Sequence, residues 1–219
     1  MPPVHDRPED ERRHRKERLA GALRVFGRLG YEDGVSGHIT ARDPEHPDRF
    51  WVNPFGMPFK HVTVSDLVLA NAAGQVVEGC HHVNQAAFTV YAEVYRARPD
   101  AVAHCHSVHG HALADHKALI LRNHGLLTVG GSVDAAAWWF ISMERPSQVQ
   151  LAARAAGHPV LIAHEEAVRT REQLGGDLVA WINYQSLWQD ISRSEPDLLF
   201  WTRRTRRPAG PAPAPRQHA

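Results

Sequence analysis

The sequence contains few cysteines and no long apolar run. Only two of its 219 residues are cysteine, too few for the disulfide framework of a small secreted domain and typical of a reducing compartment. No apolar stretch approaches the ~20 residues that a membrane-spanning helix needs, and the charged N-terminal stretch lacks the apolar core of a secretory signal. We therefore expect a cytoplasmic protein without a membrane partner.

Net charge is also nearly absent, because 25 Lys and Arg residues oppose 24 Asp and Glu residues to give +1. Proteins that bind nucleic acid usually carry a clustered basic face. The one basic run here, residues 203–207, adjoins a proline- and alanine-rich tail, which is typical of a solvated chain end. The sequence therefore predicts no nucleic-acid partner.

Length and composition favour one core. A chain of 219 residues with 43% hydrophobic content falls within the usual size of a single domain. We expect a disordered N-terminus at 1–9, one domain over 10–202, and a flexible Pro/Ala-rich tail at 203–219.

Helices are expected at both ends of the chain, with groups of strands between them. The predicted helices are 9–29, 85–98 (capped by Asn84), 133–156 (capped by Ser132 or Asp134) and a long stretch over 165–194; the predicted strands lie within 37–43, 49–55, 67–79, 101–106 and 117–130. This alternation indicates a layered α/β or α+β domain.

Four histidines fall within "HCHSVHGH", residues 104–111. On a strand, His104 and His106 share one face about 7 Å apart, and such a pair can present two nitrogens to one divalent ion. A catalytic zinc site needs a third ligand, for which His124 in the turn "RNHGLL" is the best candidate. The alternative is a histidine pair on a polar strand face. Cys105, between the two, is expected to point into the core.

Other residues have weaker signals. The stretches "SGHITAR" (36–42) and "NPFGMPF" (53–59) can bind an anion through backbone N–H groups, or can simply be turns. Glu78 and Tyr91 are candidates for an acid or base, although a solvent-facing carboxylate is the simpler interpretation of Glu78.

Together these residues resemble the class II aldolase/adducin family. The similarity extends over "SGHITARDPEHPDRFWVNPFGMPF", "HCHSVHG" and "LRNHGLLTVGGSVDAAAWWF", in the family's order. It implies an α/β fold, a three-layer αβα sandwich with a mostly antiparallel central sheet. It also implies a homotetramer with active sites between neighbouring subunits.

The resemblance also implies a ligand set. A divalent metal ion, Zn²⁺ first and Fe²⁺, Mn²⁺ or Co²⁺ as alternatives, would be held by His104, His106 and His124. The turns that bind the substrate's anionic group in relatives correspond here to Ser36, Gly37, His38, Asn53 and Gly56.

Two of the departures of this sequence from the family bear on the site. The position of the usual catalytic glutamate is Ala87, and that of its partner histidine is Tyr91, so the base must be another group, for which Tyr91 and Glu78 are the candidates. His106 and His124 are only 18 positions apart, closer than in relatives, so the middle segment is shortened.

The function expected first is a divalent-metal-dependent lyase of aldolase type, an aldehyde-lyase. It would act on a small hydroxy-carbonyl substrate through a metal-stabilised enediolate. One alternative is another metal enzyme on the same fold: an epimerase, dehydratase, decarboxylase or non-heme iron oxygenase. A second alternative is a non-catalytic, adducin-like assembly module.

Overall fold

The computed structural model describes residues 2–32, 34, 37–84, 101–105, 117–121 and 125–201, with the backbone alone at 104–105 and 121. The strands are β1 (His38–Arg42), β2 (Arg49–Val52), β3 (Val68–Asn71), β4 (Val76–Glu78), β5 (Ala101–Cys105), β6 (Ala118–Leu121) and β7 (Gly125–Gly130). The helices are α1 (Pro8–Leu29), α3 (Val133–Ala156), α4 (His164–Leu174) and α5 (Asp177–Ser194), with short 3₁₀ turns η1 (Phe59–His61), η2 (Val64–Asp66) and η4 (Pro196–Leu199). Within these ranges, no helix is long and apolar enough to cross a membrane.

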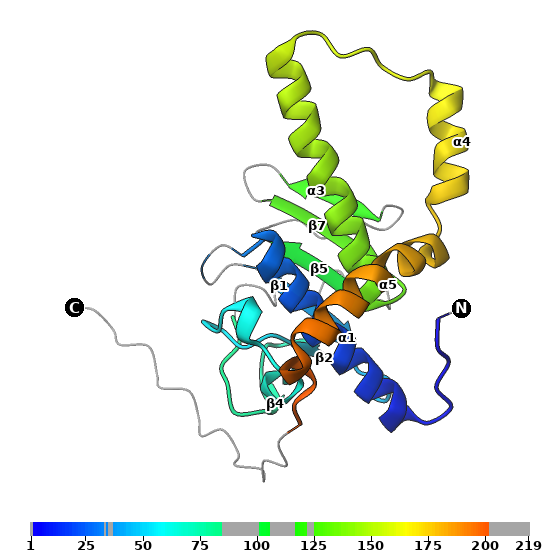
Figure 1. The fold of residues 1–219 in the computed structure, drawn as a ribbon. Coiled ribbons are helices and arrows are strands. Elements are labelled where there is room, and N and C mark those ends of the chain that lie inside the picture. The colour runs from blue at the N-terminus through cyan, green and yellow to red at the C-terminus, as the bar shows by residue number, and fades with distance from the viewer. Residues whose placement is uncertain are drawn as a thin grey trace, which may run out of the picture.

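The strands form one seven-stranded sheet in the order β4-β3-β2-β1-β5-β7-β6, and every neighbouring pair is antiparallel. Helices α1, α3 and α5 lie together on one face of it (Figure 1). The antiparallel sheet with a helical layer confirms the predicted fold class. The helix predicted at 85–98 lies outside the described residues.

Local sequence explains where α1 begins and ends. Pro8 occupies the first turn, where its missing N–H is not needed, and acidic residues follow it. At the other end Gly30 adopts a left-handed conformation with φ 74°, which glycine tolerates without strain. The helix therefore stops where predicted, but it starts inside the segment 1–9 that was expected to be disordered. The predicted tail, 203–219, lies beyond the described part of the chain.

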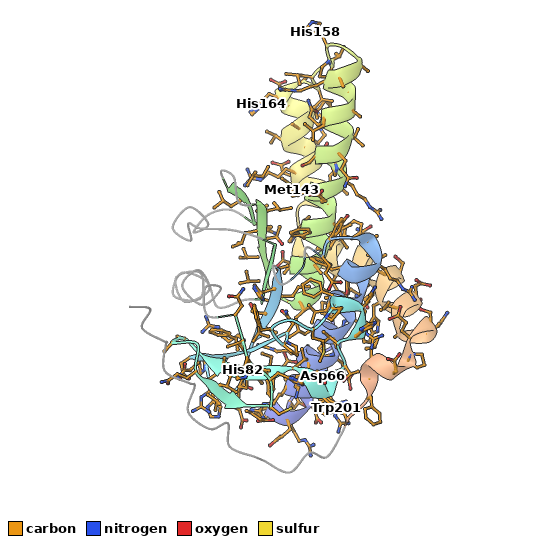
Figure 2. The ribbon with its side chains drawn as sticks, turned by 90° about the vertical axis from the view of Figure 1, so that its left-hand side faces the viewer. Asp66, His82, Met143, His158, His164 and Trp201 are labelled. Atoms are coloured by element: carbon orange, nitrogen blue, oxygen red, sulfur yellow. The ribbon has the colours of Figure 1, made fainter. Side chains whose placement is uncertain are left out.

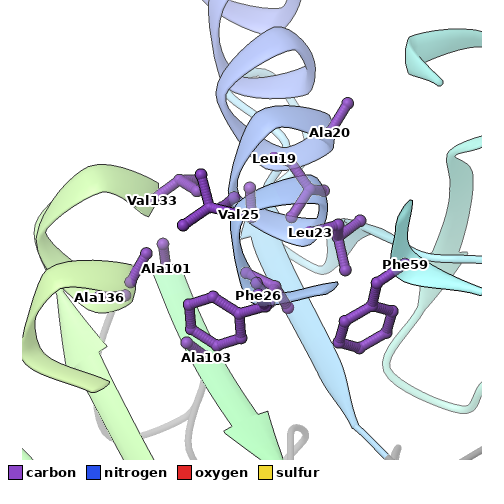
Figure 3. Packing of buried hydrophobic residues seen from close by; sticks show 14 of the residues in the cluster. Leu19, Ala20, Leu23, Val25, Phe26, Phe59, Ala101, Ala103, Val133 and Ala136 are labelled. Carbon is purple, nitrogen blue, oxygen red and sulfur yellow. The ribbon is translucent and has the colours of Figure 1, made fainter. Parts of the chain in front are cut away.

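The main core lies between α1, the sheet and α3. Buried α1 side chains pack against the alanines of β5 and the first turn of α3 (Figure 3). These include Leu19, Leu23 and Phe26 of α1, Ala101 and Ala103 of β5, and Val133 and Ala136 of α3. Because the sheet contributes small residues here, the helices can approach it closely.

The two C-terminal predictions had different outcomes. Helix α3 matches the predicted 133–156, and the hydroxyl of Ser132 accepts a hydrogen bond from the N–H of Ala135 at 3.2 Å, as expected of an N-cap. The prediction of a single helical stretch over 165–194 was wrong, because this part of the chain forms two helices, α4 and α5. Gly175 and Gly176 separate them, because each glycine costs about 1 kcal/mol in a helix interior.

Candidate functional site

His38 and His104 lie directly opposite each other on the neighbouring strands β1 and β5. Residues paired in this way on antiparallel strands project from the same face of the sheet. On β5 that face also carries Val102, which belongs to the second buried cluster, whereas Ala103 packs in the helix-side core. The side chain of His38 therefore lies on the face of the sheet turned away from α1 and α3, and the backbone of His104 pairs with it.

Asn84 holds the ring of His38. The Asn84 Nδ2 atom lies 3.2 Å from His38 Nε2. With the amide NH₂ as the donor, His38 Nε2 is the acceptor in this contact. From the sequence, Asn84 is predicted only as a helix cap. Its partner is 46 positions away, so no local pattern could have indicated the contact.

Asn53 joins two of the predicted substrate-binding turns. Its Oδ1 accepts a hydrogen bond from the N–H of Ile39 at 3.4 Å, and its Nδ2 donates to the carbonyl of Gly37 at 3.5 Å. The structure thus brings Gly37, His38 and Asn53 together. Because Asn53 is buried and its amide is used within the protein, it fixes the turn rather than facing a ligand. Gly56, with φ 77°, has open space where a Cβ would lie.

The strand register also bears on the other two candidate ligands. Cys105 pairs with Leu126 of β7, and Gly125 begins β7 with φ 99°. His106 follows Cys105 in the chain, and His124 precedes Gly125. Both histidines themselves lie outside the described residues. The backbone nevertheless leads to them from the same end of two adjacent strands.

Three further predicted residues have different outcomes. Ser36 and Tyr91 lie outside the described residues. Glu78 is exposed on the edge strand β4, with three strands between β4 and β5. It pairs with Leu69, whose side chain packs in the helix-side core. The structure therefore does not bring Glu78 together with His38 and the backbone of His104 within one chain.

One acidic group that sequence reasoning missed lies in the turn between β1 and β2. Ligand atoms of Asp43, Glu45 and His46 all lie within 4.8 Å of one another. Arg12 Nε donates to Asp43 Oδ2 at 2.8 Å, and Trp51 Nε1 donates to the same oxygen at 3.1 Å. Burial is the largest single effect and raises the pKa of the Asp43 carboxyl. The hydrogen bonds from Arg12, the Glu45 backbone and Trp51, together with the charge of Arg12, outweigh burial, so this pKa is lowered. Because Arg12 already supplies the neutralising cation, this group is better suited to closing the turn than to binding a metal.

A pocket of about 210 Å³ opens between α1, the end of β1 and the start of α3. Its charged lining includes Arg15, Arg18, Arg42 and Asp134. Arg18 and Asp134 are already joined by hydrogen bonds. None of the predicted site residues lines this pocket, so it is separate from the histidine-bearing face.

Comparison with known proteins gives one family. The family model for the class II aldolase and adducin N-terminal domain matches residues 17–116 and 111–151. The two pieces meet at 111–116, within the short stretch between His106 and His124.

Similar proteins include a decarboxylase, NovR, from Streptomyces niveus, 39% identical over 90% of this chain and 91% of that protein. A 4-hydroxy-3-prenylphenylpyruvate oxygenase/4-hydroxy-3-prenylbenzoate synthase from Streptomyces roseochromogenus is also 39% identical, over 90% of this chain and 88% of that protein. Among solved structures, an L-fuculose 1-phosphate aldolase from Glaciozyma antarctica superposes with a TM-score of 0.87 at 35% identity, covering 91% of this chain and 97% of that one. The chain belongs to the class II aldolase and adducin family.

Proposed function

We propose that this chain is a divalent-metal-dependent lyase that cleaves a carbon–carbon bond beside a carbonyl group of a small substrate. The supporting observation is the β5–β7 register, in which Cys105 pairs with Leu126. In that register the backbone leads to His106 and His124 at one end of the sheet, next to the strand that carries His104.

The donor set fits a divalent ion. Three imidazoles with an open coordination position are a common arrangement for zinc, and they also suit iron. When bound, the ion would supply Lewis-acid stabilisation of the negative charge that develops as the bond breaks. His104, His106 and His124 would hold it.

The remaining residues would orient the substrate and move a proton. Asn84 holds the His38 ring through the 3.2 Å contact, so this imidazole would be oriented beside β5, the strand that carries His104. Gly56 is exposed and leaves backbone groups of its turn accessible, and Ser36 would be a further polar group. Because the usual glutamate position is Ala87, we assign the proton transfer to Tyr91, whose pKa a nearby metal charge would lower.

Metal analysis of the purified protein tests the ligand assignment. The protein is prepared without a metal-affinity step, as wild type, His106→Ala and the matched control His158→Ala, which changes a histidine far from the sheet. We expect about one ion per chain in the wild type and the control. In His106→Ala we expect loss of the ion and a fall in turnover of more than about 100-fold. Full metal content and turnover in His106→Ala would refute the assignment.

An oxidative reaction is a second candidate. It is favoured by the two Streptomyces relatives, whose names describe a decarboxylase and an oxygenase. The internal hydrogen bonds of Asn53 also favour this candidate over a sugar-phosphate aldolase. Its amide already bonds to the backbone of Ile39 and Gly37, so it is not placed to bind a substrate phosphate.

Two assays under the same metal-loaded conditions separate these candidates. One follows aldehyde release from L-fuculose 1-phosphate, and the other follows oxygen consumption with 4-hydroxy-3-prenylphenylpyruvate and Fe²⁺. Oxygen uptake that is lost in His106→Ala would favour the oxygenase. A stable protein that takes up no metal and is inactive in both assays would favour the adducin-like assembly module.

A further inference from the structure

The distal half of α3 and the whole of α4 project from the body of the protein as a helical arm, defined here as residues 143–174. The buried residues of α3 end at Ile141. Beyond it the helix continues past Pro146, and the arm extends from Met143 to a tip near His158 (Figure 2). Helix α4 then returns towards α5, so that both ends of the arm are attached to the body (Figure 1).

The arm exposes apolar side chains. Val160, Leu161 and Ile162 at its tip are 97%, 82% and 70% exposed. On α4 itself, Val168 and Leu174 are 40% and 56% exposed, and none of the α4 residues is buried. A helix of 11 residues is marginal in water on its own, and contiguous exposed apolar residues mark interaction sites. We infer that a partner surface covers α4.

The charges of the arm indicate what kind of partner fits. Its acidic residues are Glu144, Glu165, Glu166 and Glu172, and its basic residues are Arg145, Arg154, Arg169 and Arg171. Equal numbers of each sign do not suit a nucleic acid or an anionic membrane, which attract a basic face. A surface with equal numbers of acidic and basic side chains can instead pair with a second copy of itself, so that the acidic groups of one copy meet the basic groups of the other.

Within α4 the two signs are separated along the helix. Glu165 and Glu166 lie in the first half, whereas Arg169 and Arg171 lie in the second half, followed by Glu172. Arg169 contacts Glu166 of its own helix at 3.3 Å, while Arg171 is exposed. Two antiparallel copies would place the acidic half of each beside the more basic half of the other, with opposed helix dipoles. A parallel pair would place like charges together.

Helical spacing defines the face that would meet the partner. His164, Ala167, Val168, Arg171 and Leu174 fall on one side of α4, at intervals of three and four residues. Val168 is next to the midpoint of the helix. In an antiparallel pair centred there, Val168 lies close to Val168 of the partner subunit.

We propose that the arm is a homodimerisation element, in which α4 packs antiparallel against α4 of a second copy of this chain with Val168 at the centre. The proposal does not depend on the metal or the substrate. The tetramer implied by the family resemblance does not specify which element joins the copies, whereas this proposal does.

Analytical ultracentrifugation of the full chain over the micromolar range tests the contact. Val168→Asp places a charge at the centre of the proposed interface, and Thr170→Asp, the matched control, places the same charge on the opposite side of α4. We expect the wild type and Thr170→Asp to associate alike, and the dissociation constant of Val168→Asp to rise at least about tenfold.

A crosslinking experiment keeps the proposal testable even if aspartate unfolds α4, because cysteine is close to valine in size. In a Cys80→Ser background, Val168→Cys should give a disulfide-linked dimer on mild oxidation, since a disulfide needs Cα atoms within about 7 Å. Thr170→Cys should not. A monomeric wild type, unchanged association in Val168→Asp, or equal crosslinking of the two cysteine variants would each overturn the proposal.

Discussion

Arg18 of α1 and Asp134 of α3 form a buried, two-pronged ion pair. Arg18 Nε donates to Asp134 Oδ1 at 2.6 Å, and Arg18 Nη2 donates to Asp134 Oδ2 at 2.5 Å. Gln185 of α5 contacts both side chains, each at 3.1 Å. The pair therefore ties together the three helices that cover one face of the sheet.

Removing one partner of this pair should destabilise the protein more than removing both. Asp134→Leu leaves a buried guanidinium without its carboxylate, and we expect the free energy of unfolding to fall by about 3–5 kcal/mol. Arg18→Met combined with Asp134→Leu should recover most of this loss, because the unpaired charge is gone. Urea unfolding of the two single variants and the double variant measures the difference, and strictly additive losses would contradict the prediction.

Lys16 should make stability depend on alkaline pH. Burial is the main cause that lowers its pKa from 10.5 to about 8, and its ammonium lies 3.8 Å from the centre of the Trp51 ring. Because the unfolded chain holds this proton more tightly, wild-type stability should rise relative to Lys16→Met as pH increases from about 8 to 10.5. The change in that difference should be about 3 kcal/mol, from 1.36 kcal/mol per pKa unit.

Urea unfolding of both proteins at a series of pH values checks this behaviour. Groups shared by the two proteins cancel in the comparison, so a difference that stays constant across the window would show that Lys16 is not desolvated as described.

Gly130 should not tolerate a side chain. A Cβ there would lie 2.6 Å from the backbone nitrogen of Ala136 and 2.8 Å from the Cβ of Ala135, so β7 and α3 would have to separate. We expect Gly130→Ala to lose about 1–3 kcal/mol of stability. At Gly176 a Cβ meets nothing within 4 Å, so Gly176→Ala should cost less than about 1 kcal/mol. Similar thermal denaturation midpoints for the two variants would argue against the close packing.

Replacing Asn53 should destabilise the protein more than replacing an exposed asparagine. Asn53→Ala leaves the N–H of Ile39 and the carbonyl of Gly37 without their side-chain partner, and each buried unsatisfied group costs about 1–3 kcal/mol. Asn183→Ala on α5 is the matched control, because its amide donates to the Val179 carbonyl on an exposed helix face. Denaturant unfolding should show a loss in Asn53→Ala at least twice that in the control; equal losses would contradict the proposed role in fixing the turn.

Local patterns were sufficient to predict most elements. Gly30 and Ser132 end α1 and begin α3 through their own backbone conformation and side chain, so both boundaries can be read within a few residues of sequence. The break between α4 and α5 was missed because helical periodicity resumes after Gly176, and the cost of two adjacent glycines was underestimated.

The pleat of a strand predicts that the two histidines of the H-x-H pair share one face. This stays a prediction, because His106 lies outside the described residues. The pairing of His38 with His104 depends on which strands are neighbours and on their register, which no local pattern specifies. For the same reason Glu78 was a plausible base from the sequence, although β4 lies at the far edge and its pairing with Leu69 turns the residue to the helix side.

The sheet order also explains how the family can vary in length. Strand β7 pairs with β5 on the inside, while β6 lies outside it at the edge. The connection from β5 to β6 can therefore lengthen or shorten without changing any strand pairing. The alignment with the Streptomyces niveus protein spans 246 positions, more than this chain contains, as expected if a relative carries inserted residues. Doubling the length of a loop costs only about 0.6 kcal/mol of loop-closure entropy. Natural selection can therefore add or remove whole segments between β5 and β6 without changing the register of β5, the strand that carries His104.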